Sequence, residues 1–173
     1  MKKRTTLGAT PLSGGKCRFR VWAPLRRQVS VHITAPEDRL EPLAPDDRGY
    51  HEAVLEGVEP GAHYLFRLDD EVERPDPASR SQPHGVHEPS RVAAFQGGES
   101  DPAWFGLPLT RYVIYELHVG TFSPEGTFLG VARALDRLQD LGVTAIELMP
   151  VARFPGERNW GYDGVYPFAV QDS

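Results

Sequence analysis

The sequence has a single cysteine, Cys17, among its 173 residues. One cysteine cannot form a disulfide within the chain, and it cannot supply the thiolates of a cysteine-based zinc site. The six histidines are scattered, without the spacing of a metal-binding motif such as HExxH. We therefore expect neither a metal nor a cofactor.

Long hydrophobic runs and a surplus of positive charge are also missing. No apolar stretch approaches the roughly 20 residues that a membrane-spanning helix needs. The formal net charge is -5, and the lysines and arginines form no basic stripe, so neither a membrane nor a nucleic acid is an expected partner. The first 16 residues have a basic tip but no apolar core, unlike a secretory signal. We expect a cytoplasmic protein.

The first 72 residues have the pattern of short strands separated by turns. In the stretch CRFRVW, Cys17, Phe19 and Val21 alternate with two arginines, which predicts a half-buried strand. Similar patterns predict strands over residues 17–22, 29–34, 50–58 and 63–68. Short strands at about ten-residue spacing indicate an antiparallel β-sandwich. We expect Trp22 in its core, with a glycan-facing position as the alternative.

Residues 73–110 differ in composition and contain six prolines. Proline lacks an amide donor and resists both helices and central strands. The segment therefore reads as a connector that lies along a surface and ties two domains together. We expect burial of Trp104 and Phe105 to hold it in place.

Residues 111–173 have the pattern of an α/β fold. The run YVIYELHV (112–119) is almost continuously apolar, which indicates a strand covered on both faces. Residues 127–141 have helical spacing, with Thr127 as a helix cap, and residues 143–149 predict a second covered strand. A parallel pair joined by a helix leaves an apolar face and an edge that need neighbours. The only further strand candidate is VYPFAV (165–170), so the segment looks like the opening of a larger α/β barrel.

Two carboxylates fall within the predicted parallel strands, Glu116 and Glu147. Adjacent strands lie about 4.8 Å apart, so the pair could match the roughly 5–5.5 Å separation of the carboxyl groups of a retaining glycosidase. Alternatively, each is a buried polar group satisfied by the other or by the backbone. Both lie mid-strand, whereas barrel enzymes place catalytic groups after the strands, which favours the second interpretation.

An aromatic cluster follows the second parallel strand in the stretch RNWGYDGVY. Trp160, Tyr162 and Tyr166 offer flat rings that can hold the apolar face of a pyranose, and Asp163 can accept hydrogen bonds from sugar hydroxyls. A core cluster that closes the sheet is the alternative for these aromatic residues.

The stretches YELHVGTFSPEGTF, LGVTAIELMPVARFPGERNWGYDGVYPFAVQ and RPDPASRSQPHGVHEPS resemble the α-amylase superfamily, glycoside hydrolase family 13. Within it they are most similar to the trehalohydrolases that act on maltooligosyltrehalose. The resemblance implies a mixed fold. It consists of an immunoglobulin-like β-sandwich of the early-set type (1–72), a proline-rich connector (73–110) and the truncated start of a catalytic (β/α)8 barrel of the TIM type (111–173).

The resemblance also implies a reaction, the retaining hydrolysis of the α-1,4 bond next to the terminal trehalose of maltooligosyltrehalose. The family's three catalytic carboxylates would lie beyond Ser173, so this chain would hold no catalytic residue and be inactive alone. Tyr162 matches a tyrosine that stacks on the sugar, with Asp163 and Trp160 as further substrate-binding residues. The implied partners are maltooligosyltrehalose or another α-glucan, and maltooligosyltrehalose synthase as the pathway partner.

Two alternatives remain open at this point. The chain could be a fragment of a glycogen branching or debranching enzyme, or a stand-alone α-glucan-binding module. The spacer FPGERN before WGY favours the trehalohydrolases over the branching enzymes, and the unpaired half-barrel argues against a stand-alone module.

Overall fold

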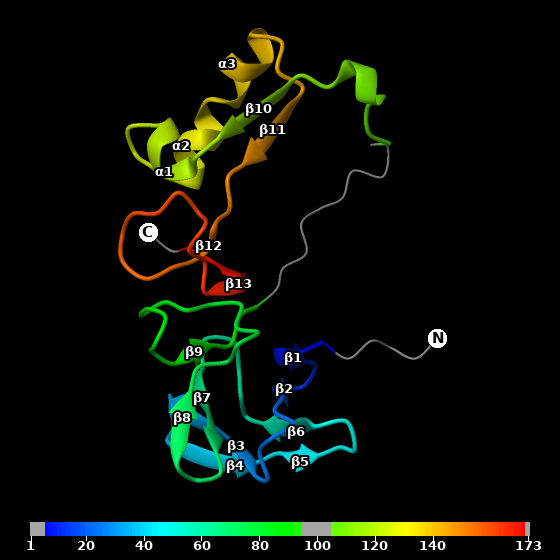
Figure 1. Cartoon of the computed structure of the whole chain (residues 1–173), viewed down its shortest axis with the longest axis vertical. Coiled ribbons are helices and arrows are strands. Elements are labelled where there is room, and N and C mark those ends of the chain that lie inside the picture. The colour runs from blue at the N-terminus through cyan, green and yellow to red at the C-terminus, as the bar shows by residue number, and fades with distance from the viewer. Residues whose placement is uncertain (1–5, 95–104, 172–173) are drawn as a thin grey trace. The chain divides into compact units, whose positions relative to one another are not determined.

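The computed structural model describes residues 6–94 and 105–171. These residues form two compact units (Figure 1). The first unit holds most of residues 6–94, together with Ala152–Gly156 and the stretch from Gly164 onward. The second unit holds the described residues from 105 to Val151 and the loop Glu157–Asp163.

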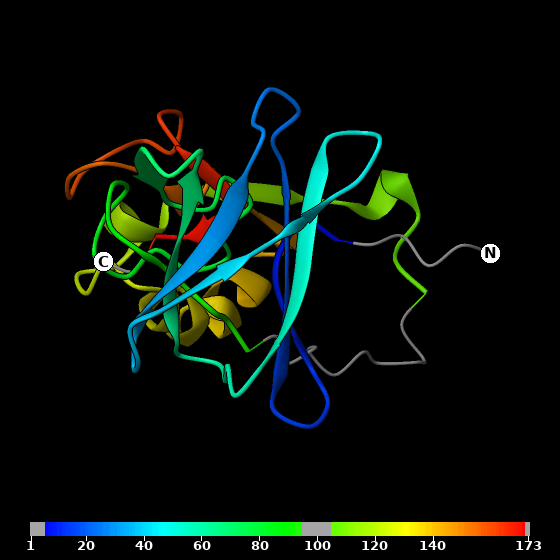
Figure 2. The same ribbon diagram turned by 90° about the horizontal axis from the view of Figure 1, so that it is seen from below.

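The first unit contains a sandwich of two antiparallel sheets, as the alternating pattern predicts. One sheet has the strand order β1-β2-β6-β5, and the other has the order β4-β3-β7-β8 with β9 paired to β7. Figure 2 shows the long blue and cyan strands of this unit from below. The strands are β1 (Gly8–Leu12), β2 (Lys16–Trp22), β3 (Val29–Ala35), β4 (Arg39–Pro42), β5 (Ala44–Pro45), β6 (Tyr50–Glu56), β7 (His63–Leu68), β8 (Val72–Arg74) and β9 (Ser90–Arg91).

The sandwich core is built from alternate residues of the two sheets. Phe19 from β2 packs edge-on against Tyr64 from β7, with ring centroids 5.0 Å apart. Cys17 is fully buried in this cluster, and burial raises the pKa of its thiol to about 11. The single cysteine therefore stays a neutral thiol at physiological pH and serves as an apolar core residue.

Trp22 lies outside this core, so the expected core position is wrong. Its side chain is 57% exposed. The reason is the strand alternation itself, since Phe19 and Val21 point inward and Trp22 follows on the opposite face. The indole Nε1–H donates a hydrogen bond to the backbone oxygen of Arg48 at 3.1 Å, which fixes the ring on the sheet surface.

A buried carboxylate ties residues beyond 74 to the sandwich. Asp76 is fully buried and accepts hydrogen bonds from the Tyr64 hydroxyl at 2.6 Å and from the Ala78 amide at 2.8 Å. Its own amide donates to Ser90 Oγ at 3.0 Å. Burial raises the pKa of the Asp76 carboxyl, against the lowering effect of the hydrogen bond from Tyr64.

Strand β1 forms hydrogen bonds with the same segment after residue 74. Arg80 donates hydrogen bonds to the backbone oxygens of Ala9 at 3.0 Å and Leu7 at 3.2 Å. Gly8 has φ +83° and lies so close to this segment that an added Cβ would stand 2.9 Å from the oxygen of Ala78, so only glycine fits. The structure thus extends the first unit past the expected boundary at residue 72, because the start of the expected connector supplies part of its buried polar core.

The last described strands also belong to the first unit. β12 (Ala152–Arg153) pairs antiparallel with β13 (Tyr166–Val170). The Tyr166 hydroxyl donates to the backbone oxygen of Val86 at 2.7 Å, and its ring is buried beside Val86 and Ala169. The predicted strand over 165–170 is confirmed, but it does not extend the parallel sheet, and Tyr166 is a structural residue of this unit.

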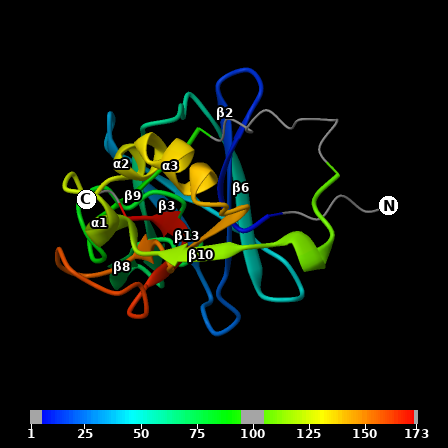
Figure 3. The same cartoon turned by 90° about the horizontal axis from the view of Figure 1, so that it is seen from above.

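The second unit contains the predicted parallel strand–helix–strand arrangement. β10 (Ile114–Leu117) pairs in parallel with β11 (Ala145–Leu148), in register from Ile114 with Ala145 to Leu117 with Leu148. Figure 3 shows β10 and the helices of this unit from above. Around the strands lie a 3-10 helix, η1 (Leu109–Arg111), and three short helices, α1 (Val119–Phe122), α2 (Phe128–Arg133) and α3 (Leu135–Asp140).

The predicted helix over 127–141 is present but interrupted. Thr127 caps its start as predicted, accepting a hydrogen bond from the Gly130 amide at 3.1 Å. At Ala134 a 3-10-like turn, with its amide 3.0 Å from the oxygen of Val131, separates α2 from α3. Both halves keep an apolar residue against the sheet, because Val131 and Leu138 pack together with Leu117.

We expected other parts of the chain to cover both faces of the parallel strands. Among the described residues, only the face towards the helices is covered. The helices bury Leu117, whereas Ile114 and Glu116 alternate to the other face, where Ile114 is 58% exposed. Phe105, expected to be buried, is 93% exposed, and Trp104 lies outside the described residues.

Removing the Asp76 carboxylate should destabilise the first unit. In Asp76→Ala the Tyr64 hydroxyl and the Ala78 amide lose a buried acceptor, so the free energy of unfolding should fall by about 2–4 kcal/mol. Hydrogen exchange of the β2 and β6 amides measures this change. Asp47→Ala, at an exposed position, should change it by less than about 0.5 kcal/mol. Equal effects of the two substitutions would contradict the role of Asp76.

The parallel pair should be much less stable than the sandwich in the isolated 173-residue chain, because a two-stranded sheet with an uncovered face buries little apolar area. We expect the Ile114–Leu117 amides to exchange about 100-fold faster than those of Lys16–Trp22, which corresponds to about 2.7 kcal/mol. Equal protection of the two strands in a hydrogen-exchange experiment would show that the pair is stable by itself.

Candidate functional site

The loop Glu157–Asp163 follows the second parallel strand and carries the predicted sugar-binding residues. Trp160 is 63% exposed, Tyr162 is 71% exposed, and Asp163 is exposed as well. These side chains therefore offer their surfaces to a ligand instead of closing a core. The alternative of a core cluster is wrong for Trp160 and Tyr162.

Asn159 gives this loop its shape. Its Oδ1 accepts hydrogen bonds from the amides of Gly161 at 2.6 Å and Asp163 at 3.4 Å. Its Nδ2 donates to the Asp163 carboxylate at 2.6 Å. One side chain thus turns the backbone around Trp160 and Tyr162 and holds one oxygen of Asp163, while the second carboxylate oxygen can still accept a hydrogen bond.

His118 connects the loop to the end of the first parallel strand. Its Nε2 lies 2.7 Å from the backbone oxygen of Asn159, so it carries the proton and donates. The other ring nitrogen faces the Thr121 hydroxyl at 3.4 Å. The imidazole also packs edge-on against Trp160, with ring centroids 5.2 Å apart. The loop is therefore held at the carboxyl end of both parallel strands, where α/β proteins bind ligands.

The tight turn after Trp160 depends on a glycine. Gly161 has φ +100°, and an added Cβ would overlap the backbone oxygen of Pro150, just after β11. No other residue can be accommodated without moving the loop away from the strand. This contact explains why glycine separates the two exposed aromatic residues.

Glu116 and Glu147 are brought together by the strand register. Both are exposed on the sheet face away from the helices, so the interpretation as buried, mutually satisfied groups is wrong in this chain. They lie within the strands, whereas the loop with Tyr162 follows the end of β11.

Asn159 and His118 were not identified as site residues from the sequence. A signal for Asn159 exists, because asparagine two residues before glycine is typical of a turn closed by the side chain. The role of His118 depends on a contact over 41 residues of chain, which local pattern does not show. Among residues 6–94 and 105–171, no group of three or more His, Cys, Asp or Glu side chains is placed to hold a metal ion.

Comparison with known proteins agrees with this architecture. Residues 6–80 match the family model of carbohydrate-binding module 48, the isoamylase N-terminal domain. Over 155 residues, 90% of the chain, the sequence is 47% identical to the malto-oligosyltrehalose trehalohydrolase of Saccharolobus solfataricus. The predicted resemblance to the trehalohydrolases is confirmed. The match covers 27% of that relative, so the chain spans about a quarter of its length.

Solved structures give the same result. A crystal structure from Salmonella typhimurium, provisionally named an alpha amylase, superimposes with a TM-score of 0.85 at 40% identity and covers 96% of this chain and 28% of that one. An Anoxybacillus pullulanase complexed with maltotetraose has a TM-score of 0.78 at 23% identity, over 95% of this chain and 29% of that one. At this identity the pullulanase shows a shared fold. Like the trehalohydrolases, these proteins are several times longer than the chain.

Among the described residues, no helix is long and apolar enough to span a membrane.

Replacing Asn159 should loosen the sugar-binding loop. In Asn159→Ala the three hydrogen bonds to Gly161 and Asp163 are lost, and trypsin should cleave after the exposed Arg158 about fivefold faster, which corresponds to about 1 kcal/mol. The Asn159→Ser variant keeps a side-chain acceptor for the amides without placing a second carboxylate beside Asp163, and should fall in between. Gln139→Ala, which removes an exposed amide side chain from α3, should leave the rate unchanged. Cleavage of Asn159→Ala at the wild-type rate would contradict the role of Asn159.

Proposed function

We propose that this chain is part of a retaining glycoside hydrolase that cleaves the α-1,4-glucosidic bond next to the terminal trehalose of maltooligosyltrehalose and releases trehalose. The observation that supports this most is the ordered WGYD loop at the carboxyl end of β10 and β11, in a chain 47% identical to a trehalohydrolase over 90% of its length. The activity would belong to the whole polypeptide, and the 173-residue chain alone would be inactive.

In this proposal Tyr162 stacks on a glucose ring of the substrate. Its side chain is 71% exposed on a loop fixed by Asn159, so the ring is accessible while its backbone is held in place. The free oxygen of Asp163 accepts a hydrogen bond from a hydroxyl of the same sugar. Trp160, held by His118, provides a second apolar surface next to it. These groups bind the substrate and perform no chemistry.

The parallel pair would be the first quarter of a (β/α)8 barrel. The uncovered face with Ile114 and Glu116 would then point into the barrel interior, where further strands bury it. Hydrolysis with retention needs a nucleophilic carboxylate and a carboxylic acid on opposite sides of the scissile bond. Those groups would follow later strands, beyond Ser173, and neither Glu116 nor Glu147 serves as one.

The substrate class in this proposal is an α-glucan, with maltooligosyltrehalose as the specific substrate. The reaction would be a step of trehalose biosynthesis in the cytoplasm, and maltooligosyltrehalose synthase would supply the substrate. A glycogen branching or debranching activity is the alternative, and the spacer FPGERN argues against a branching enzyme. A stand-alone glucan-binding module is the other, and the carbohydrate-binding module match over residues 6–80 is what favours it.

The full-length polypeptide that contains this chain should release trehalose from maltooligosyltrehalose. Tyr162→Ala should lower kcat/KM by about 10–100-fold, because the loss of one stacked aromatic ring costs about 1.5–3 kcal/mol. Tyr162→Phe, which keeps the ring, should stay within about threefold of the wild type. Trehalose is measured after digestion.

Formation of α-1,6 branches by the full-length protein would refute the proposed reaction in favour of a branching enzyme. Trehalose release by the isolated 173-residue chain would refute its inactivity and require catalytic groups within it.

A further inference from the structure

The loop Glu157–Asp163 lies between the strands β12 and β13, and we call this strand pair, together with Val165, the stem. Arg153 pairs with Tyr166 at the end of the stem that faces the loop. The Val165 amide donates a hydrogen bond to the backbone oxygen of Arg153 at 2.8 Å. The stem therefore brings the two ends of the loop together.

The stem is narrow at the point where the chain leaves the loop. An added Cβ at Gly164 would stand 2.7 Å from the Cβ of Ala152, so a larger residue would push the two segments apart. Asp163 directly precedes this glycine, and Tyr162 precedes Asp163. The three-residue step from Asp163 to Tyr166 spans at most about 11 Å. A shift of Tyr166 is therefore carried to the sugar-binding side chains.

Tyr166 holds the stem in place through its hydroxyl. The ring is buried beside Val86 and Ala169, and the hydroxyl donates to the backbone oxygen of Val86 at 2.7 Å. Burial raises the pKa of this hydroxyl, and the nearby Asp76 raises it further. The hydroxyl therefore stays protonated and keeps donating over the physiological pH range.

The acceptor of this hydrogen bond lies in a turn that Gln82 closes. Gln82 is fully buried, and its Nε2 donates to the backbone oxygens of Gly85 and Glu88, both at 3.1 Å. Val86 lies between these two residues, so its backbone has little freedom to move. The turn follows the residues 6–80 that match the carbohydrate-binding module, and that match assigns it no role.

The other contacts of the loop hold a different part of it. His118 contacts the backbone of Asn159, and Gly161 lies against Pro150. Tyr162 comes after these two contacts along the chain and before the stem. Its exposed side chain is thus held from two directions, and the stem supplies the second of them.

We propose that Tyr166 is a positioning residue for sugar binding, because its hydrogen bond to Val86 fixes the end of the loop that carries Tyr162 and Asp163. This role rests on the proposed function, in which the loop binds the substrate sugar. Tyr166 is buried and touches no sugar itself. It keeps the exposed ring of Tyr162 in one orientation, which reduces the conformational entropy that the ring loses when a sugar covers it.

Trypsin cleavage after the exposed Arg158 tests the hold on the loop without any sugar. In Tyr166→Phe of the 173-residue chain the ring stays and the hydrogen bond is lost. Cleavage should be about fivefold faster, which corresponds to about 1 kcal/mol. Gln82→Ala, which loosens the turn around Val86, should act in the same direction and replaces Tyr166→Phe if that variant does not fold. Unchanged hydrogen exchange of the Lys16–Trp22 amides shows that the sandwich is intact.

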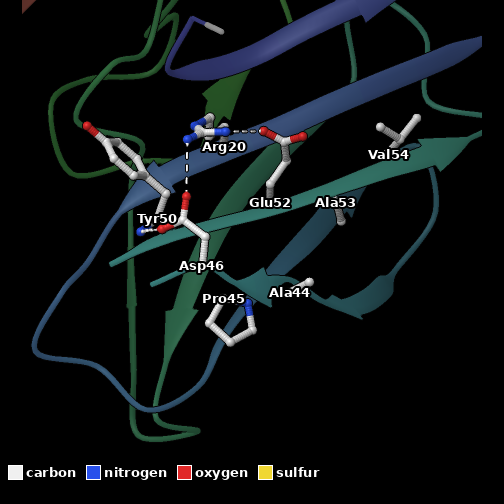
Figure 4. Close-up of a pocket in the computed structure, with 8 residues that line it drawn as sticks. All are labelled: Arg20, Ala44, Pro45, Asp46, Tyr50, Glu52, Ala53 and Val54. Atoms are coloured by element: carbon white, nitrogen blue, oxygen red, sulfur yellow. Dashed lines mark hydrogen bonds and ion pairs between the residues drawn. The ribbon is translucent and has the colours of Figure 1, made fainter. Parts of the chain in front are cut away.

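Tyr50→Phe is the matched control, because it also removes one tyrosine hydroxyl. Tyr50 lies in β6 of the sandwich, where the guanidinium carbon of Arg20 is 4.4 Å from its ring centroid and both residues line a pocket (Figure 4). This substitution should change neither the cleavage rate after Arg158 nor the kinetics of the full-length protein.

The full-length polypeptide provides the second readout, kcat and KM for the release of trehalose from maltooligosyltrehalose. Tyr166→Phe should raise KM by about three- to tenfold and leave kcat within about twofold, because it weakens binding without touching the catalytic groups. In a Tyr162→Ala background the same substitution should change KM by less than about twofold, since the ring that Tyr166 positions is gone.

Wild-type cleavage rates in both Tyr166→Phe and Gln82→Ala would overturn the role of Tyr166. Faster cleavage with an unchanged KM would also overturn it. So would equal increases in KM with and without the Tyr162 ring, which would show a merely structural role. A full-length wild-type protein that releases no trehalose would instead refute the proposed function, and the cleavage rates would then decide on Tyr166 by themselves.

Discussion

The parallel pairing of β10 with β11 is the constraint on which the candidate site depends. Because parallel strands end at the same edge, His118 directly after β10 comes within reach of the loop that follows β11. An antiparallel pair would put these two chain ends at opposite edges. The contact between His118 and the Asn159 backbone is thus a consequence of topology, and the exposed rings of Trp160 and Tyr162 follow from the turn that Asn159 closes.

Much of this architecture could be predicted from the sequence, because the main elements have clear periodicity. The strands around Phe19, Val31 and Tyr64 and the parallel pair lie within two residues of their predicted ends. The short strands β4, β5, β8 and β9 were not predicted, since two to four residues carry too little periodicity. The domain boundary was placed too early because proline content indicates irregular backbone but says nothing about burial, and irregular backbone can be buried when a carboxylate such as Asp76 satisfies it.

Prediction of the site was limited for a different reason. Local composition identified the exposed aromatic residues of the loop, but the groups that hold them act through contacts distant in sequence or through backbone atoms. Trp22 shows the same limit. The alternation of β2 assigns it to the outer face, as the structure has it, whereas the general preference of tryptophan for the interior suggested the core. Strand geometry decided its position.

Two acidic residues of the first unit, Asp76 and Asp69, contribute to stability with opposite dependences on pH. Burial raises the pKa of Asp76, so its contribution to stability is fully present below the unfolded pKa and is lost as the pH rises through the folded pKa. Asp69 accepts hydrogen bonds from the amides of Gln28 and Arg27, which lower its pKa. Its contribution is present above the unfolded pKa and lost as the pH falls through the folded one. The attachment of the segment after residue 74 and the turn before β3 therefore have different pH dependences.

The exposed apolar side chains of Ile114, Trp22 and Trp160 differ in whether a polar group holds them in place. Ile114 on β10 is exposed without any polar group that could orient it, as expected of a surface that lacks a packing partner. Trp22 is fixed by a hydrogen bond to Arg48, and Trp160 lies on a loop held by Asn159 and His118. A ring that is already immobile loses little conformational entropy when a ligand covers it. The anchored ring of Trp160 is thus suited to reversible binding of a ligand, whereas an apolar face without such an anchor gains most from burial against a packing partner.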